Sequence, residues 1–90
     1  MEITLEKARV VAQQDGKELG EMTFVDSGSF YIIDHTGVED EARGLGVGKK
    51  LVAHFVEHAK AEGKTVLPLC PFAKAEFEKN AEYQEILHGK

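Results

Sequence analysis

The first third of the chain repeats a pattern of apolar-rich runs separated by turn residues, which predicts antiparallel β-strands. Asp15-Gly16 is a dipeptide typical of a tight hairpin turn, and the run that follows it places Met22 and Phe24 on one face. The last of these runs, residues 30–33, has a bulky side chain at every position and therefore predicts a central strand that is covered on both faces. The three predicted strands are residues 8–14, 18–25 and 30–33.

The hydrophobic period changes in the middle of the chain. Between residues 47 and 59, apolar residues recur at spacings of three and four, which predicts an amphipathic helix that Gly63 ends. A short strand over residues 65–69 follows, then a second helical pattern over 73–79 and an apolar patch over 83–87. This order predicts an α+β fold, a mostly antiparallel sheet with two packed helices.

Length and composition are consistent with one domain over residues 1–90, since 42% of the residues are hydrophobic and no low-complexity tract occurs. No apolar run reaches the roughly 18 residues that span a bilayer, so we expect no membrane partner. The N-terminus shows no signal-like core and the single cysteine forms no internal disulfide, which predicts a cytoplasmic protein. No sequence feature determines the oligomeric state, and a monomer is our working hypothesis.

The net charge of −5 bears on the partners. Binding to a phosphate backbone requires a basic patch, and no basic cluster here exceeds the pair Lys49-Lys50. We therefore expect no nucleic-acid partner. An acidic surface is better suited to attracting a cationic acceptor such as an amine.

A glycine-rich turn comes directly before the first predicted helix. Glycines allow a close approach of the backbone to a ligand, and the unpaired N–H groups of the first helical turn then face an anion. This arrangement predicts phosphate binding. The candidate residues are Arg43, Gly44, Leu45, Gly46, Val47, Gly48 and Lys49.

Two better-known phosphate loops do not fit this turn. A P-loop requires glycine where Arg43 stands and Ser or Thr where Lys50 stands. The dinucleotide-binding motif requires a third glycine where Lys49 or Leu51 stands, depending on the glycine from which it is counted. Both interpretations are rejected.

The turn does fit the pattern R-x-x-G-x-G, formed by Arg43, Gly46 and Gly48. This pattern resembles the pyrophosphate-binding motif of the GNAT acetyltransferase superfamily. Together with residues 33–36 (IDHT) and 67–70 (LPLC), it is similar to a group of very small, single-domain GNAT-like proteins, over nearly the whole chain. The resemblance implies an N-acetyltransferase that uses acetyl-CoA and an amine acceptor. It also implies a curved sheet that separates near 33–36 and 67–70, with acetyl-CoA in the gap.

Cys70 is a candidate catalytic residue. It is the only thiol, it follows a strand end, and Pro71 restricts it to an extended conformation. In the small GNAT-like group a cysteine at this point lies near the acetyl group, which implies a nucleophile here. The alternative is a buried cysteine that serves only packing.

His35 is the second catalytic candidate, because a neutral imidazole can act as a base near pH 7. The alternative is a histidine that caps a strand end through Asp34 or Thr36. Larger GNAT members use a tyrosine on the last helix to protonate the leaving thiolate, and the resemblance places Phe77 at that position. The role is then vacant, or it is filled by Cys70, water or Tyr83.

The segment His54-Phe55-Val56-Glu57-His58 matches the zinc-hydrolase pattern H-x-x-E-H. Its middle residues belong to the apolar stripe and only about 30 residues follow, so we interpret it as a solvated helix face and expect no metal. Two functions besides catalysis stay open on the same fold: binding of CoA or acyl-CoA without turnover, and an interaction module without a ligand.

Overall fold

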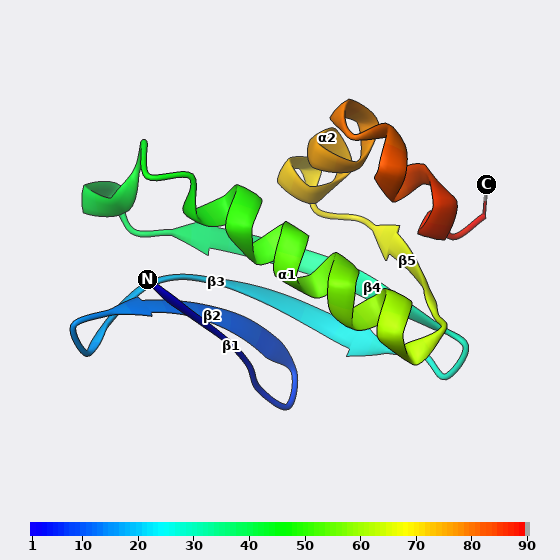
Figure 1. The fold of residues 1–90 in the computed structure, drawn as a ribbon, viewed down its shortest axis with the longest axis horizontal. Coiled ribbons are helices and arrows are strands. Elements are labelled where there is room, and N and C mark those ends of the chain that lie inside the picture. Colours follow the sequence, from blue (N-terminus) through cyan, green and yellow to red (C-terminus); the bar gives the residue numbers. More distant parts are fainter. Residues whose placement is uncertain (90) are drawn as a thin grey trace.

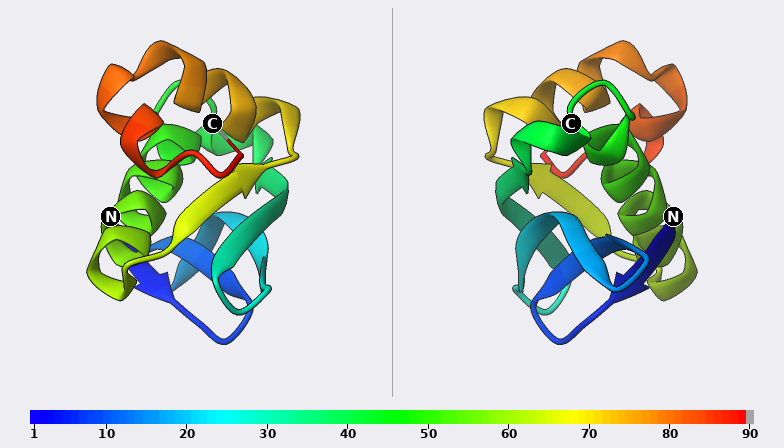
Figure 2. Two further views of the ribbon diagram at one scale, coloured as in Figure 1. Left: turned by 90° about the vertical axis from the view of Figure 1, so that its right-hand side faces the viewer. Right: turned by 90° about the vertical axis from the view of Figure 1, so that its left-hand side faces the viewer.

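The computed structural model describes residues 1–89, which form a curved five-stranded sheet in the order β1-β2-β3-β4-β5 (Figures 1 and 2). All neighbouring strands are antiparallel except β4 and β5, which run parallel. The helix α1 connects that pair and packs along one face of the sheet, and α2 follows β5. The strands are β1 (Glu2–Leu5), β2 (Arg9–Gln14), β3 (Lys17–Asp26), β4 (Phe30–Val38) and β5 (Thr65–Pro68). The helices are α1 (Val47–Glu62) and α2 (Pro71–Lys79), with short 3₁₀ segments η1 (Asp40–Ala42) and η2 (Ala81–Ile86).

The predicted α+β fold is confirmed, including the hairpin turn between β2 and β3. Asp15 and Gly16 both have positive φ, 53° and 79°, as the tightest hairpin turns require. The strand β1 is an element that the pattern did not predict. Its alternation covers only four residues, and Ile3 and Leu5 become half-buried only once β2 lies beside them.

The sheet separates along β4. Pairing with β5 ends at Ile33 and Pro68, and the Ile33 carbonyl accepts hydrogen bonds from the backbone N–H groups of Leu69 (3.0 Å) and Cys70 (3.2 Å). Beyond this point β4 continues to Val38 beside β3 alone. A bulge at the same level leaves Asp34 without a partner, because its neighbours pair with consecutive residues of β3. The predicted separation near residues 33–36 and 67–70 is therefore confirmed.

The core lies between α1 and one face of the sheet. The apolar stripe of α1 packs against side chains that β2, β3 and β4 direct to the same side, among them Val10, Met22 and Ile33. The ring of Phe55 is fully buried, 4.6 Å from that of Phe24 and 5.1 Å from that of Tyr31, between centroids. This aromatic cluster fixes α1 on the sheet, and with it the position of the N-terminus of α1.

The expectation that both faces of residues 30–33 are covered is only partly correct. Tyr31 and Ile33 are buried under α1, whereas Phe30 and Ile32 on the opposite face are half-buried. No helix covers this face among the described residues. Instead, Phe30 stacks on the ring of His88 at 3.8 Å, and the backbone of His88 bonds to Val66 at the edge of β5.

We expect Phe55→Ala to lower the free energy of unfolding by about 3–5 kcal/mol, because it leaves a cavity among buried aromatic rings. Chemical denaturation followed by circular dichroism measures this loss. The matched control is Phe72→Ala, the same substitution at a ring that is 39% exposed. A similar loss in both variants would contradict this description of the core.

Candidate functional site

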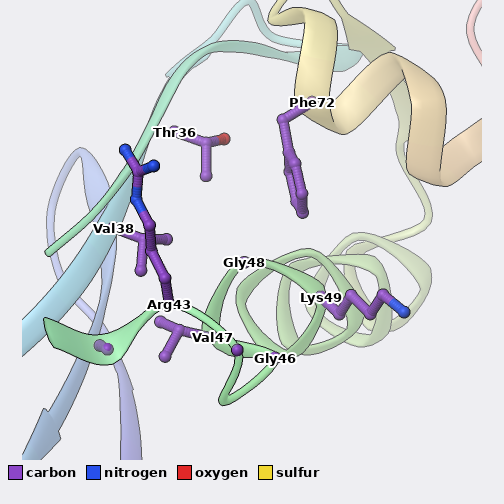
Figure 3. Close-up of a pocket in the computed structure, with 10 residues that line it drawn as sticks. Thr36, Val38, Arg43, Gly46, Val47, Gly48, Lys49 and Phe72 are labelled. Atoms are coloured by element: carbon purple, nitrogen blue, oxygen red, sulfur yellow. The ribbon is translucent and has the colours of Figure 1, made fainter. Parts of the chain in front are cut away.

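A cavity of about 520 Å³ lies where β4 separates from β5 (Figure 3). The free part of β4 forms one wall, the glycine-rich turn and the first turn of α1 form the floor, and Phe72 of α2 stands opposite. The volume is within the range of small-molecule sites. The lining residues are Thr36, Val38, Ala42, Arg43, Gly44, Gly46, Val47, Gly48, Lys49 and Phe72.

The N-terminus of α1 has the composition of an anion site. Gly46 is the N-cap in a left-handed conformation (φ 73°), which favours glycine, and it supplies no side chain to bond the first N–H groups. The first turn contains no acidic residue but two lysines, Lys49 and Lys50. Unpaired N–H groups, the helix dipole and a lysine at the cavity therefore act in the same direction, in favour of a phosphate.

Gly48 is favoured by the space available to its side chain and not, like Gly46, by its backbone conformation. It lies within the helix, where a glycine is unfavourable relative to alanine. A Cβ atom at this position would lie 2.6 Å from Cζ and 2.7 Å from Cε2 of Phe72. The ring of Phe72 therefore occupies the space that the missing side chain leaves, so that the first turns of α1 and α2 meet across the cavity (Figure 3).

Cys70 lies just behind this cavity. It is the N-cap of α2 and is 6% exposed, and its Sγ lies 3.4 Å from Oγ1 of Thr36, within hydrogen-bond range for sulfur. The two residues come from opposite sides of the gap, Thr36 from β4 and Cys70 from the start of α2, two residues after β5. Thr36 lines the cavity directly, so the thiol is one hydrogen bond away from it.

The surroundings of Cys70 favour its thiolate. Burial raises the pKa of the Cys70 thiol, but hydrogen bonds to the sulfur more than offset this effect, and the pKa is lowered below its usual value. The largest of these comes from the Thr36 hydroxyl, and the others from the backbone N–H groups of Ala73, Phe72 and Thr36. The neutral thiol makes no capping bond to α2, so the N–H groups stabilise mainly the charged form.

His35 does not lie in the cavity. In the β3–β4 pair, Thr36 is opposite the buried Met22 and shares its face, whereas His35 is opposite Thr23 on the face away from α1. His35 is exposed there, and its Nε2 lies 3.3 Å from where a Cβ of Gly37 would be. The structure thus separates the two catalytic candidates by the thickness of the sheet, and a catalytic role for His35 stays a prediction.

Comparison with known proteins identifies the family. The family model for GCN5-related N-acetyltransferases matches residues 9–86. This chain belongs to that family, abbreviated GNAT. No curated protein matches the sequence significantly.

Solved structures agree with this assignment. A GCN5-like protein from Staphylococcus aureus is 36% identical, with a TM-score of 0.78 over 99% of this chain and 89% of its own. The ribosomal-protein-S18-alanine N-acetyltransferase of Escherichia coli shares the fold at 16% identity (TM-score 0.69, 79% of this chain and 49% of that one). So does a Bacillus anthracis acetyltransferase in complex with acetyl-CoA, at 20% identity (TM-score 0.62, 82% of this chain and 47% of that one).

Neither Phe77 nor Tyr83, the aromatic residues considered for the role of the family's tyrosine, places a hydroxyl group at the cavity. Phe77 is 1% exposed and packs into the core, 5.3 Å from the ring of Tyr83. Tyr83 is half-buried and does not line the cavity. Burial and the nearby Glu82, Glu76 and Glu57 raise the pKa of Tyr83, so it holds its proton firmly.

Most of the predicted GNAT phosphate turn lines the cavity; only Leu45 does not, and its side chain points to solvent, 51% exposed. Lys49 extends outward from α1, away from Arg43 (Figure 3). Arg43 pairs with Asp40 at 3.2 Å, but both side chains are largely exposed and the pair contributes little stability. The sequence predicted no role for Phe72, and for Thr36 it offered only a possible capping contact with His35. The close approach of Phe72 to α1 had one signal in the sequence, because Gly48 is a glycine within the predicted helix, where a close neighbour can replace a side chain.

The two histidines of the zinc-hydrolase pattern, His54 and His58, have different surroundings. Nε2 of His58 lies 3.1 Å from the Tyr31 hydroxyl, and His54 is exposed on α1. Within residues 1–89, no three of the His, Cys, Asp and Glu side chains gather closely enough to hold a metal ion. In the same range, no helix has the length and apolar character to cross a bilayer.

The contact between Gly48 and Phe72 predicts coupling between the two positions. In the parent protein, Gly48→Ala should give little or no stabilisation, because the new methyl group meets the Phe72 ring. In a Phe72→Ala background the same change should stabilise by up to about 1 kcal/mol, the ordinary gain of alanine over glycine in a helix. Denaturation of all four proteins gives the coupling energy, and equal effects of Gly48→Ala in both backgrounds would show that the contact has no energetic weight.

Proposed function

We propose that this GNAT domain binds acetyl-CoA in the cavity and transfers the acetyl group to an amine. The observation that carries the proposal is the arrangement of the cavity, which has a phosphate-type helix N-terminus at one end and the Cys70–Thr36 pair at the other. The fit can be judged from the residues themselves. Gly46 and Lys49 offer N–H groups and positive charge to a pyrophosphate, and Gly44 and Gly46 have the positive φ that lets the turn bend around it.

The free edge of β4 supplies the second part of the site. Because β5 leaves after Pro68, the backbone groups of residues 34–38 on that side have no strand partner. The amide groups of a pantetheine arm would pair with such an edge as a short strand does. A pantetheine arm bound along this edge would run from the glycine turn, past Val38 and Thr36, toward Cys70.

In the proposed reaction, Cys70 accepts the acetyl group from the thioester and passes it to the amine. A lowered pKa increases the fraction of thiolate, and the thiolate is the nucleophilic form. The net charge of −5 favours the approach of a cationic amine as the acceptor.

A second function, binding of CoA without turnover, is favoured by two observations. Cys70 is only 6% exposed, and the residue at the position of the family's tyrosine, Phe77, has no hydroxyl group. A domain of this kind would bind acetyl-CoA and CoA alike and would leave added amines unmodified.

The phosphate site is tested by Lys49→Glu. A carboxylate in the first turn is favourable for the helix dipole, so the variant should keep its stability. It should nevertheless repel the CoA phosphates and weaken acetyl-CoA binding at least tenfold, about 1.4 kcal/mol, in titration calorimetry.

The control for Lys49→Glu is Lys60→Glu, which makes the same charge change near the other end of α1. Lys60 makes only a 3.8 Å pair with Glu57 and lies outside the cavity. Its effect on acetyl-CoA binding should stay below about threefold, since exposed charges that far apart are screened by salt. Equal weakening in the two variants would refute the assignment of the phosphate site to this turn.

The covalent step is tested on Cys70. Incubation with acetyl-CoA should add one acetyl group to this sulfur, detected by mass spectrometry and removed by hydroxylamine. Cys70→Ala should abolish this addition and any transfer to amines, while CoA binding stays nearly unchanged. If Cys70→Ala transfers acetyl groups as fast as the parent, the amine attacks the thioester directly. Acetylation of Cys70 without onward transfer to any amine would favour the binding function instead.

A further inference from the structure

The proposed function leaves one proton without a carrier. When acetyl-CoA gives up its acetyl group, the CoA sulfur must gain a proton, and Phe77 has none to give. Resting on that function, we propose that Thr36 is the proton relay of the site, in hydrogen-bond contact with the reacting sulfur of Cys70. From the sequence, Thr36 was expected only as part of the segment 33–36 and as a possible capping partner of His35.

The position of Thr36 supports this role. It lies on the part of β4 that has left β5, where its hydroxyl faces the cavity rather than a neighbouring strand. Figure 3 shows the hydroxyl oxygen directed toward the side of α2, from which Cys70 approaches. Threonine is branched at Cβ and has few χ1 rotamers, so the direction of its hydroxyl is restricted.

Thr36 is also the single hydroxyl-bearing side chain that lines the cavity within the part of the chain that the structure describes. The other candidates are placed less well. His35 is on the opposite face of the sheet, and Tyr83 packs on Phe77 with its pKa raised. A hydroxyl can accept one proton while it donates another, so it needs no unusual pKa to act as a relay.

The proton balance of the step is complete. The Cys70 sulfur forms a bond to the acetyl carbon, and the bond from that carbon to the CoA sulfur breaks with its electron pair on CoA. The Cys70 thiol proton moves to Oγ1 of Thr36 as the sulfur attacks, so that the sulfur reacts with thiolate character, and the Thr36 hydroxyl proton moves to the CoA sulfur. The products are acetylated Cys70, CoA with a free thiol, and an unchanged threonine. When an amine attacks the acetylated Cys70, the bond from the acetyl carbon to the Cys70 sulfur breaks with its electron pair on sulfur. The amine nitrogen gives a proton to Oγ1 of Thr36 as the Thr36 hydroxyl proton moves to this sulfur, so the products are the amide and the Cys70 thiol.

The experiment compares Thr36→Val, which keeps the shape and removes the hydroxyl, with Thr36→Ser, which keeps the hydroxyl. The first readout needs no cosubstrate: the pH titration of thiolate absorbance, which is clean because Cys70 is the only cysteine. Thr36→Val should shift this titration to higher pH, because the thiolate loses a hydrogen-bond donor, and Thr36→Ser should titrate like the parent. The second readout is acetylation of Cys70 by acetyl-CoA at a fixed thiolate fraction, which should slow by roughly a hundredfold in Thr36→Val and recover in Thr36→Ser.

Each result decides something. A parent-like titration and a parent-like acetylation rate in Thr36→Val, with acetyl-CoA affinity and thermal stability unchanged, overturn the relay. A shifted titration with a normal rate at matched thiolate fraction also overturns it and leaves Thr36 as a residue that only stabilises the thiolate. If the parent binds acetyl-CoA but never acetylates Cys70, the covalent route fails and the relay with it. If the parent does not bind acetyl-CoA, the proposed function itself fails.

Discussion

The end of pairing between β4 and β5 is the constraint on which the rest of this domain depends. Pro68 is the last paired residue of β5, and without an N–H group it cannot extend the ladder as a donor. The Ile33 carbonyl then accepts the N–H groups of both Leu69 and Cys70, which turns the chain away from the sheet. On the other strand, the bulge at Asp34 changes the direction of β4 at the same level. Local chemistry on both strands therefore opens one gap.

That gap receives the N-termini of both helices. α1 directs its first N–H groups into the gap without a side-chain cap, and α2 begins at Cys70 with Pro71 in its first turn. A helix N-terminus favours negative charge, so the same physical effect favours an anion at the start of α1 and the thiolate form of Cys70 at the start of α2. The protein as a whole is acidic, with a net charge of −5, but this part of its surface is suited to anions.

The closeness of the two helices has a consequence for access. The Phe72 ring rests where a side chain at position 48 would be, and Cys70 beside it is nearly buried. A buried thiol is normally an unreactive one, because desolvation disfavours its charged form. Here the hydrogen bonds at the sulfur outweigh that cost, a combination more typical of a functional cysteine than of one used only for packing.

The sequence by itself determined most of the elements and the glycine turn before α1. The period of two in the first third, the period of three to four after residue 47 and the glycines with R-x-x-G-x-G spacing are local properties, and local rules of conformation suffice to interpret them. The strand β1 was missed because its burial depends on a partner strand rather than on its own pattern. Only the tertiary structure decided which side chains meet. The bulge at Asp34 shifts the alternation of β4, so that Thr36 faces the cavity and His35 does not. The contacts of Cys70 with Thr36 and of Gly48 with Phe72 join residues that lie 34 and 24 positions apart in the chain, and no local pattern specifies such a pairing.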